Sequence, residues 1–270
     1  MLRIGLLGAG GIAEAVVGAV LQGALPNVKV VNVAGATSDS QNARRVSELA
    51  GANAVPPALV HESVDLVLEA ATGAAALEIL PGIWNAGTDT VVISIGALLQ
   101  PGLAARMSEF RAAGGRVIHP AGAIAGLDGV RAMAARGGLK EAGIMTTKTP
   151  ASLRGAPYVV ENGIELPDNV PMQVFSGNAR EAAIGFPANV NVAAALSLAG
   201  IGPDATTVQI YSDPKAKVTA HVIHAEGDSG ELEVRLKLKP SPGNPRTSYL
   251  AALSAISTLQ ELSQSINAAR

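Results

Sequence analysis

Two of the four histidines of the chain lie close together, in the segment AKVTAHVIHAEG (216–227). An imidazole with an ordinary pKa of about 6.5 takes up and releases protons near neutral pH, so either histidine is a candidate general acid or base. Solvated or hydrogen-bonded structural histidines are the alternative. In a strand, His221 and His224 point to opposite faces, so only one of them can face a given site.

A glycine-rich turn follows the first apolar run of the chain, residues 2–7. Within GLLGAGGIAEA, Gly8 permits a tight turn and Gly10 lets the backbone approach a pyrophosphate at the positive end of a helix. Ala13 then allows that helix to pack closely on the sheet. The pattern predicts a dinucleotide site, with a purely structural glycine turn as the alternative. The residues expected to contact the cofactor are Gly8, Gly10, Gly11, Ile12 and Ala13.

The residues after the second apolar run leave the choice of dinucleotide open. The acidic residue that usually binds the adenosine ribose is missing there, since Asp39 comes late in NVAGATSDSQNARR. Thr37 and Ser38 suit either a 2′-phosphate, with help from Arg44 or Arg45, or a hydrogen bond to the ribose. Both arginines also fit solvated helix charges. The expected cofactor is NAD or NADP.

The composition excludes several function classes. A formal net charge of −2 without a run of basic residues offers no electrostatic footprint for nucleic acid or a membrane surface. The absence of cysteine excludes disulfides and thiolate metal sites, and no histidine–carboxylate cluster has metal-ligand spacing. No apolar run is long enough to span a membrane, and the broken apolar start of the chain does not resemble a signal peptide. We therefore expect no metal, no nucleic acid, no membrane and a cytoplasmic location.

The first half of the chain alternates apolar runs with helix-length segments. The runs fall at 2–7, 28–35, 64–72, 90–99 and 115–123. Such βα repeats predict an α/β fold with a Rossmann-type parallel sheet. We expect this dinucleotide-binding domain to comprise residues 1–120 and a C-terminal helix, residues 246–270.

From about residue 121 the strands alternate apolar and polar residues, as in ELEVRLKLK (231–239). One wet face is typical of an antiparallel or mixed sheet. The pattern predicts a second α+β domain over residues 121–245, in which TTVQIYS, KVTAHVIHA and ELEVRLKLK form a meander. NPRTS (244–248) is expected to be a turn into the last helix.

Several longer motifs resemble the L-aspartate dehydrogenase family of NAD(P)-dependent enzymes. They are SIGALLQPGL, HPAGAIAGLDGV, FSGNAREAAIGFPANVNVAAALSLAGIG, DPKAKVTAHVIHAEG and NPRTS, in this order. The resemblance covers nearly the whole chain and implies oxidative deamination of L-aspartate to oxaloacetate and ammonia through iminosuccinate, or the reverse. It also implies a catalytic and dimer-forming second domain, hence a homodimer, and a place in NAD biosynthesis.

The resemblance implies roles for individual residues. Ala123 and Asn191 fall on the positions that touch the nicotinamide cofactor, and His221 falls on the catalytic histidine. Two positions depart from the family pattern. Thr219 stands where an asparagine usually precedes the histidine, and Thr149 separates the residues of the usual Lys-Pro pair.

A substrate with two carboxylates calls for cations or oriented amides. Lys148, Arg180 and Arg246 lie in or beside the matched motifs, and each also fits an ordinary surface charge. Asn189 is a further candidate for substrate binding, while Asn189 or Asn191 also suits the N-cap of the alanine-rich helix that follows.

Two other functions remain open at this point. An oxidoreductase of the dihydrodipicolinate reductase or homoserine dehydrogenase type would share the architecture but not the substrate. A dinucleotide-binding sensor without turnover would share the glycine turn. The positions of Asn191 and His221, outside the nucleotide domain, favour an enzyme.

Overall fold

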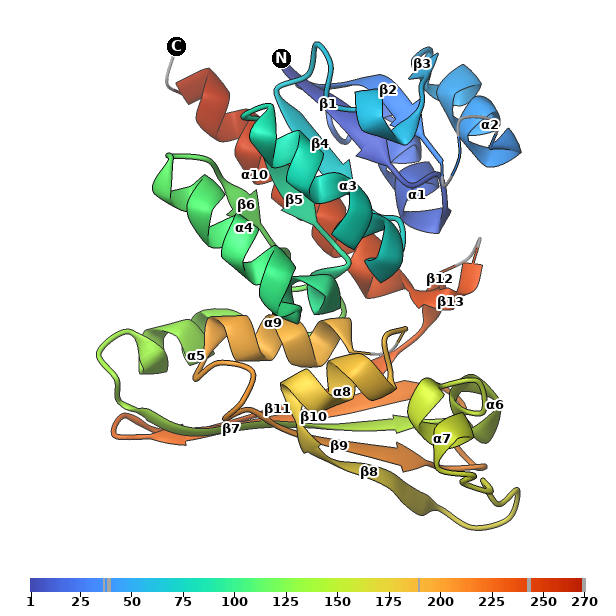
Figure 1. Ribbon diagram of the computed structural model, residues 1–270, viewed down its shortest axis with the longest axis vertical. Coiled ribbons are helices and arrows are strands. Elements are labelled where there is room, and N and C mark those ends of the chain that lie inside the picture. The colour runs from blue at the N-terminus through green and yellow to red at the C-terminus, as the bar shows by residue number, and fades with distance from the viewer. Residues whose placement is uncertain (36, 38–39, 189, 242–243, 269–270) are drawn as a thin grey trace. The chain divides into compact units, whose positions relative to one another are not determined.

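The computed structural model describes residues 1–35, 37, 40–188, 190–241 and 244–268, of which residues 244–247 and 266–268 are described by their backbone only. The chain forms two compact units (Figure 1). The first unit combines Met1–Gly122 with Ser241–Arg270, and the second is Ala123–Pro240. None of the helices in the described ranges combines the length and the apolar character that a bilayer span requires.

The first unit is built on a six-stranded parallel sheet, called sheet A, in the order β3-β2-β1-β4-β5-β6. This confirms the prediction of a Rossmann-type sheet. Its strands are β1 (Leu2–Leu7), β2 (Val28–Ala34), β3 (Asn53–Ala54), β4 (Leu66–Glu69), β5 (Asp89–Val92) and β6 (Val117–Ile118).

Helices cover both faces of sheet A, as the apolar strands require. They are α1 (Gly11–Leu21), α2 (Gln41–Ala50), α3 (Gly73–Asn85), α4 (Pro101–Ala112) and α10 (Tyr249–Ala268), with the short 3₁₀ helices η1 (Pro57–Leu59) and η2 (Ile95–Leu99). In Figure 1, α3 and α4 lie in front of the sheet and α10 lies behind it.

Helix α10 joins the core on the α1 side of sheet A. Ala255 and Leu259 are fully buried there, in one cluster with Val16 and Val17 of α1. Leu253 of the same helix remains 41% exposed. Small alanines allow two helices to approach closely, so the buried stripe of α10 runs through its alanines as well as its leucines.

The second unit is built on a five-stranded mixed sheet, called sheet B, in the order β11-β10-β7-β9-β8. The prediction of a second, mixed or antiparallel sheet is therefore confirmed. The strands are β7 (Leu139–Lys148), β8 (Met172–Asn178), β9 (Thr207–Ser212), β10 (Thr219–Gly227) and β11 (Gly230–Leu238). The helices are α5 (Leu127–Ala134), α6 (Pro150–Leu153), α7 (Pro157–Glu161), α8 (Ala179–Gly185) and α9 (Asn191–Ala199).

The predicted meander is wrong in one of its two pairings. Strands β10 and β11 form the expected antiparallel hairpin, but β9 does not pair with β10. Strand β7 lies between them, antiparallel to β10 and parallel to β9. Strands close in sequence usually pair, yet the alternation within a strand does not specify its partner.

The segment NPRTS is also different from the prediction. It forms strand β13 (Asn244–Ser248), which pairs with the short strand β12 (Pro240–Ser241). Pro245 has no amide N–H to donate. It is compatible with this ribbon because each strand of a two-stranded sheet has one edge that makes no ladder hydrogen bonds.

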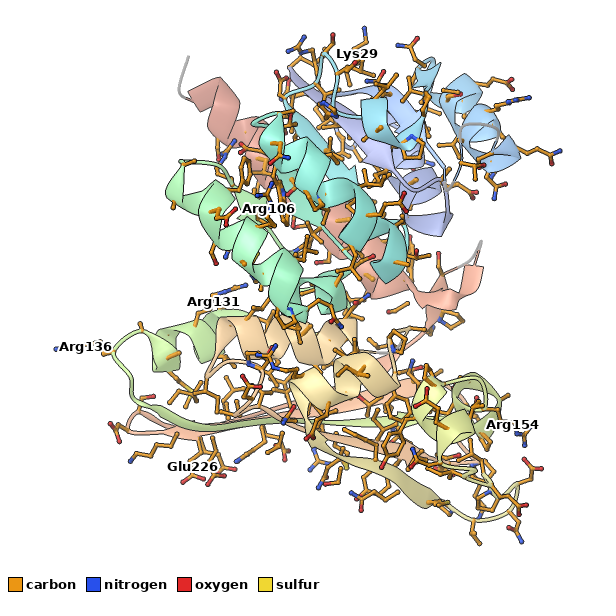
Figure 2. All side chains as sticks on the ribbon, in the orientation of Figure 1. Lys29, Arg106, Arg131, Arg136, Arg154 and Glu226 are labelled. Atoms are coloured by element: carbon orange, nitrogen blue, oxygen red, sulfur yellow. The ribbon has the colours of Figure 1, made fainter. Side chains whose placement is uncertain are left out.

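The two faces of sheet B differ in environment. Helices α5, α8 and α9 pack on its inner face, where Ile144, Ile210 and Ile223 are buried. The outer face carries exposed charged side chains, and Glu226 extends from the side opposite the helices (Figure 2). Residue alternation therefore decides which side chains of β7 and β10 meet the inner, protected face.

Candidate functional site

The glycine turn joins β1 to α1 at the carboxyl edge of sheet A, where open α/β sheets bind their ligands. Gly8 has a φ of +103°, and a Cβ there would lie 2.5 Å from the carbonyl oxygen of Ala70. Only glycine fits this position without strain. Ala13, in the first turn of α1, is completely buried, as the close packing of this helix on the sheet requires.

The start of α1 is suited to the pyrophosphate of a dinucleotide. Its N-cap is Gly10, which provides no side-chain hydrogen bond, and a Cβ on Gly10 would meet nothing within 4 Å. The first amide N–H groups of a helix have no partner within it and carry the positive end of the dipole. Open space at Gly10, beside the first amides of this helix, fits an anionic ligand.

A buried carboxylate next to the glycine turn was not found by sequence reasoning. Glu69 ends β4 and is 0% exposed. It accepts hydrogen bonds from the Ala71 amide at 2.9 Å and from the Ser94 amide and hydroxyl at 2.9 and 2.8 Å. Burial raises the pKa of Glu69, against the effect of these donors. The one available signal was an acidic residue inside the apolar run VDLVLEAAT.

The residues considered for a 2′-phosphate are only partly described. Ser38 and Asp39 lie outside the described residues, and Thr37 is exposed beside them. Arg45 forms an ion pair with Glu14, in the first turn of α1. The Arg45 guanidinium is thus engaged with a carboxylate of the glycine-turn helix.

His221 is buried on the inner face of sheet B. It is 3% exposed, and the alternation along β10 turns His224 to the other face, as expected from the sequence. Thr146, 4% exposed, lies directly opposite on β7, with Oγ1 at 2.9 Å from Nδ1 of His221. Thr146 was also missed by sequence reasoning, because its proximity depends on the pairing of β7 with β10.

Lys148 lies two residues after Thr146, at the end of β7, and on the same face. Burial lowers the pKa of Lys148 to about 8. Burial, and secondarily the charge of Lys148, lower the pKa of His221 to about 4. The imidazole is therefore neutral at pH 7, while most of the Lys148 side chains carry a positive charge. A neutral base beside a cation suits a substrate that brings both an acidic proton and a carboxylate.

Four more residues were predicted to bind the cofactor or the substrate: Asn191, Asn189, Arg246 and Ala123. Asn191 is the first residue of α9, where Val190 takes the N-cap position, so Asn191 does not cap this helix. Asn189 lies outside the described residues, as does the side chain of Arg246, whose backbone belongs to β13. Ala123 lies half-buried in the turn before α5.

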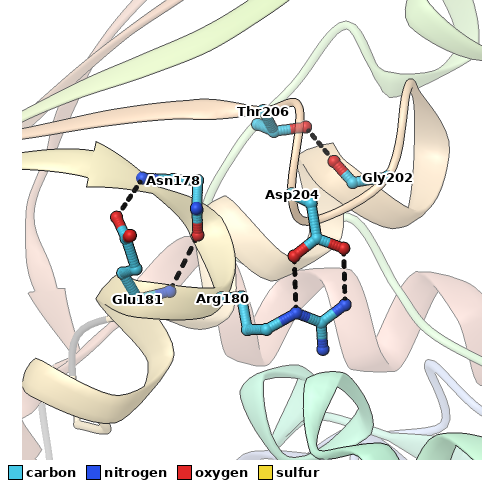
Figure 3. A network of polar contacts seen from close by, with 6 residues as sticks. All are labelled: Asn178, Arg180, Glu181, Gly202, Asp204 and Thr206. Carbon is cyan, nitrogen blue, oxygen red and sulfur yellow. Dashed lines mark hydrogen bonds and ion pairs between the residues drawn. The ribbon is translucent and has the colours of Figure 1, made fainter.

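Arg180, another candidate for a substrate carboxylate, binds a carboxylate of the protein itself. Its guanidinium donates to both oxygens of Asp204, at 2.6 and 2.8 Å (Figure 3). The same motif starts α8 with a capping box between Asn178 and Glu181. The conspicuous charges of FSGNARE thus support the fold of the second unit.

Thr219 and Thr149, the two departures from the family pattern, lie near His221 and Lys148 in sequence and have simple local roles. Thr219 opens β10, half-buried and on the same face as His221. Thr149 is the N-cap position of α6, and its carbonyl oxygen accepts a hydrogen bond from the Ser152 hydroxyl at 2.8 Å. Pro150 then takes the first helical position, which suits proline.

His224 belongs to an acidic group on the outer face. It faces Glu226 at 3.9 Å and Glu231 at 3.6 Å, contacts that are ion pairs only when the ring is protonated. Ligand atoms of Glu141, His224 and Glu226 lie within 4.8 Å of one another. Exposed carboxylates often gather in this way without an ion, and burial gives no support to a metal site here.

The chain matches known proteins along nearly its full length. Residues 128–262 match the family described as "Aspartate dehydrogenase, C-terminal", and residues 8–120 match "Homoserine dehydrogenase, NAD binding domain". An L-aspartate dehydrogenase of Methanosarcina mazei is 39% identical, over 97% of both chains. One from Bradyrhizobium diazoefficiens is 37% identical, over 96% of this chain and 91% of its own.

A solved structure agrees with these sequence matches. The crystal structure of aspartate dehydrogenase from Thermotoga maritima superimposes with a TM-score of 0.71 at 25% identity, covering 97% of each chain. The likeness therefore extends over both units, the parallel sheet and the mixed sheet alike.

Proposed function

The chain belongs to the L-aspartate dehydrogenase family, and we propose that His221 is the acid/base of the reaction it catalyses. The protein is an oxidoreductase that depends on a nicotinamide dinucleotide. Its reaction is the oxidative deamination of L-aspartate to oxaloacetate and ammonia through iminosuccinate, or the reverse reductive amination. The observation that supports this role is the buried, neutral ring of His221, which contacts Thr146 and feels the charge of Lys148 in a chain matched to this family.

The cofactor, NAD or NADP, would be held by residues of both sequence halves. We assign its pyrophosphate to the backbone of Gly8, Gly10, Gly11, Ile12 and Ala13, and its nicotinamide to contacts with Ala123 and Asn191. The bound nicotinamide supplies an acceptor for the hydride that leaves the α-carbon of aspartate. Initial rates measured with NAD and with NADP decide between the two.

His221 acts on protons in this proposal. Its Nε2 takes a proton from the substrate ammonium, so that the nitrogen lone pair can form the imine as hydride leaves. After passing this proton to solvent, Nε2 takes a proton from the water that adds to iminosuccinate, and it returns that proton to the nitrogen that leaves as ammonia. Lys148 binds a substrate carboxylate as a cation, with Asn189 and Arg246 as further substrate contacts.

The first test replaces the two histidines of β10 one at a time. We expect His221→Ala to lower kcat for aspartate about 10²- to 10⁴-fold, the usual effect of removing a general base. His224→Ala is the matched control, since His224 lies on the same strand and the opposite face. It should stay within about threefold of wild type. A His221→Ala variant that turns over at the wild-type rate would refute the assigned mechanism.

A panel of amino acids and oxo acids, followed by nicotinamide absorbance, tests the substrate. Activity restricted to aspartate and oxaloacetate supports the proposal. Activity on homoserine or another substrate alone favours the related oxidoreductases, and dinucleotide binding without turnover on any of them favours a sensor.

The broader setting is also proposed. We propose a cytoplasmic homodimer formed through sheet B, with a place in NAD biosynthesis. Support for the dimer comes from the outer face of sheet B, where Met145 of the central strand is 36% exposed.

A further inference from the structure

The contact between Thr146 and His221 is fixed by the sheet rather than by flexible side chains. The two residues are direct partners in the antiparallel register of β7 and β10, and both are buried. A cross-strand pair on one face brings the two side chains together. The 2.9 Å distance between Oγ1 and Nδ1 is that of a hydrogen bond.

This contact involves only one of the two ring nitrogens. In the described part of the chain, Nε2 of His221 has no hydrogen-bond partner. A neutral imidazole carries its proton on one nitrogen and its lone pair on the other, and the partner of the first nitrogen selects which. Nε2 is therefore the nitrogen available to a substrate, and the role of Thr146 decides whether it has a lone pair.

We propose that Thr146 is a positioning residue whose hydroxyl oxygen accepts the Nδ1–H of His221 and so keeps the Nε2 lone pair available as the base. This inference rests on the proposed function of His221. When Nε2 takes a proton from the substrate ammonium, the Nδ1–H bond to Thr146 persists in the imidazolium. The same contact therefore orients the ring before and after the proton transfer. If the hydroxyl donated to Nδ1 instead, Nε2 would carry the proton and could not act as a base.

The charged group next to this pair is Lys148, whose positive charge favours the neutral ring. On the neighbouring strands, the inner-face partners of His221 and Thr146 are Leu236 and Ile210, which do not titrate. Among the neighbours paired in sheet B, the hydroxyl of Thr146 is thus the polar group in contact with Nδ1. Removing this hydroxyl therefore removes the hydrogen bond that selects the tautomer of His221.

The test compares Thr146→Val, which removes the hydroxyl at nearly constant shape, with Thr146→Ser, which keeps it. Thr147→Val is the matched control, because Thr147 is the next residue on β7 and faces the other way. Imidazole ¹⁵N chemical shifts of the full-length protein report the tautomer, with the His221 signal assigned by its loss in His221→Ala. Activity is followed as kcat and KM for aspartate and as the pH dependence of kcat.

We expect wild type, Thr146→Ser and Thr147→Val to hold the Nδ1–H tautomer. In Thr146→Val the signal should move toward the Nε2–H form. Leaving a buried donor without its acceptor should lower kcat about tenfold or more, with a small change in KM. Thr146→Ser should recover most of the rate.

An Nε2–H tautomer in the wild-type protein would overturn the inference, and so would an unchanged tautomer and kcat in Thr146→Val. If Thr146→Val does not fold, the tautomer of His221 in the wild-type spectrum still tests the inference. The proposed roles of His221 and Thr146 can be refuted separately. Full turnover in His221→Ala would refute the base, whereas the ¹⁵N shifts test the control by Thr146 independently of activity.

Discussion

At the scale of single residues, the site depends on two side chains whose pKa values are lowered together. Burial lowers the pKa of His221 to about 4 and that of Lys148 to about 8, and the Lys148 charge contributes to the shift of His221. A substrate carboxylate bound by Lys148 would cancel part of this charge. The pKa of His221 should then rise in the complex, which makes the ring a stronger base when the substrate is present.

Lys148→Met tests this coupling. A base works only when it is neutral, so wild-type kcat/KM should fall as the pH drops through the His221 pKa of about 4. Without the cation, this acidic limb should move to higher pH, and KM for aspartate should rise about tenfold or more through the loss of a carboxylate contact. The pH profile of kcat/KM measures both effects.

Lys140→Met is the control for the loss of a charge on the same strand. Lys140 is exposed and pairs with Asp228, at the opposite end of β7 from Lys148. Its replacement should leave the pH profile unchanged. An acidic limb that stays in place in Lys148→Met would contradict the coupling.

At the scale of elements, Glu69 connects two turns at the carboxyl edge of sheet A. Its carboxylate binds Ala71, at the start of the turn after β4, and Ser94, in the turn after β5. The carbonyl of Ala70, between Glu69 and Ala71, lies against the space that only a glycine at position 8 leaves open. Glu69 therefore shapes the edge on which the dinucleotide is proposed to bind.

We expect Glu69→Gln to destabilise the protein by about 1–3 kcal/mol, since its NH₂ group would face an N–H or O–H donor and leave it unsatisfied. Thermal or urea unfolding measures this change, and titration with the dinucleotide should give a weaker affinity. Glu78→Gln, on the exposed side of α3, is the control and should stay within about 0.5 kcal/mol of wild type.

The pH dependence of Glu69 has a definite sign. Burial raises its pKa, so the folded state holds the proton more strongly than the unfolded state. Its contribution to stability is full below the ordinary carboxyl pKa and is lost as the pH rises through the raised value. If Glu69→Gln and wild type had the same free energy of unfolding, the three hydrogen bonds that Glu69 accepts from Ala71 and Ser94 would contribute nothing to stability.

At the scale of the whole molecule, the outer face of sheet B is the surface through which we propose that two copies associate. Met145 lies in its central strand, with Gln209 of β9 and Val222 of β10 as its paired neighbours. An exposed methionine in the middle of an uncovered sheet face is typical of an interface core. Arg235 of β11 is paired with Val222, and Glu226 lies farther along β10.

Met145→Asp should therefore convert a dimer into a monomer, because a carboxylate at the centre of an interface is buried without a partner. Light scattering after size-exclusion chromatography measures the mass. Leu21→Asp introduces the same charge at a position of α1 that is 62% exposed, and should leave the dimer intact. A wild-type protein with a monomer mass would exclude the proposed association.

The sequence by itself determined the elements with strong local patterns. The buried strands of sheet A, the glycine turn before α1 and the opposite directions of His221 and His224 all follow from spacing along one segment. The motifs also identified the family, because the order of residue types along the chain is a property of the sequence alone.

The tertiary structure decided which elements meet. The insertion of β7 between β9 and β10 contradicted the meander, and it alone brings Thr146 and Lys148 next to His221. The hydrogen bonds of Glu69 to the turn after β5 and the ion pair of Arg180 with Asp204 likewise join segments far apart in sequence. Burial, pKa and hydrogen-bond partners depend on neighbours in space, and the periodicity within a strand or helix does not specify them.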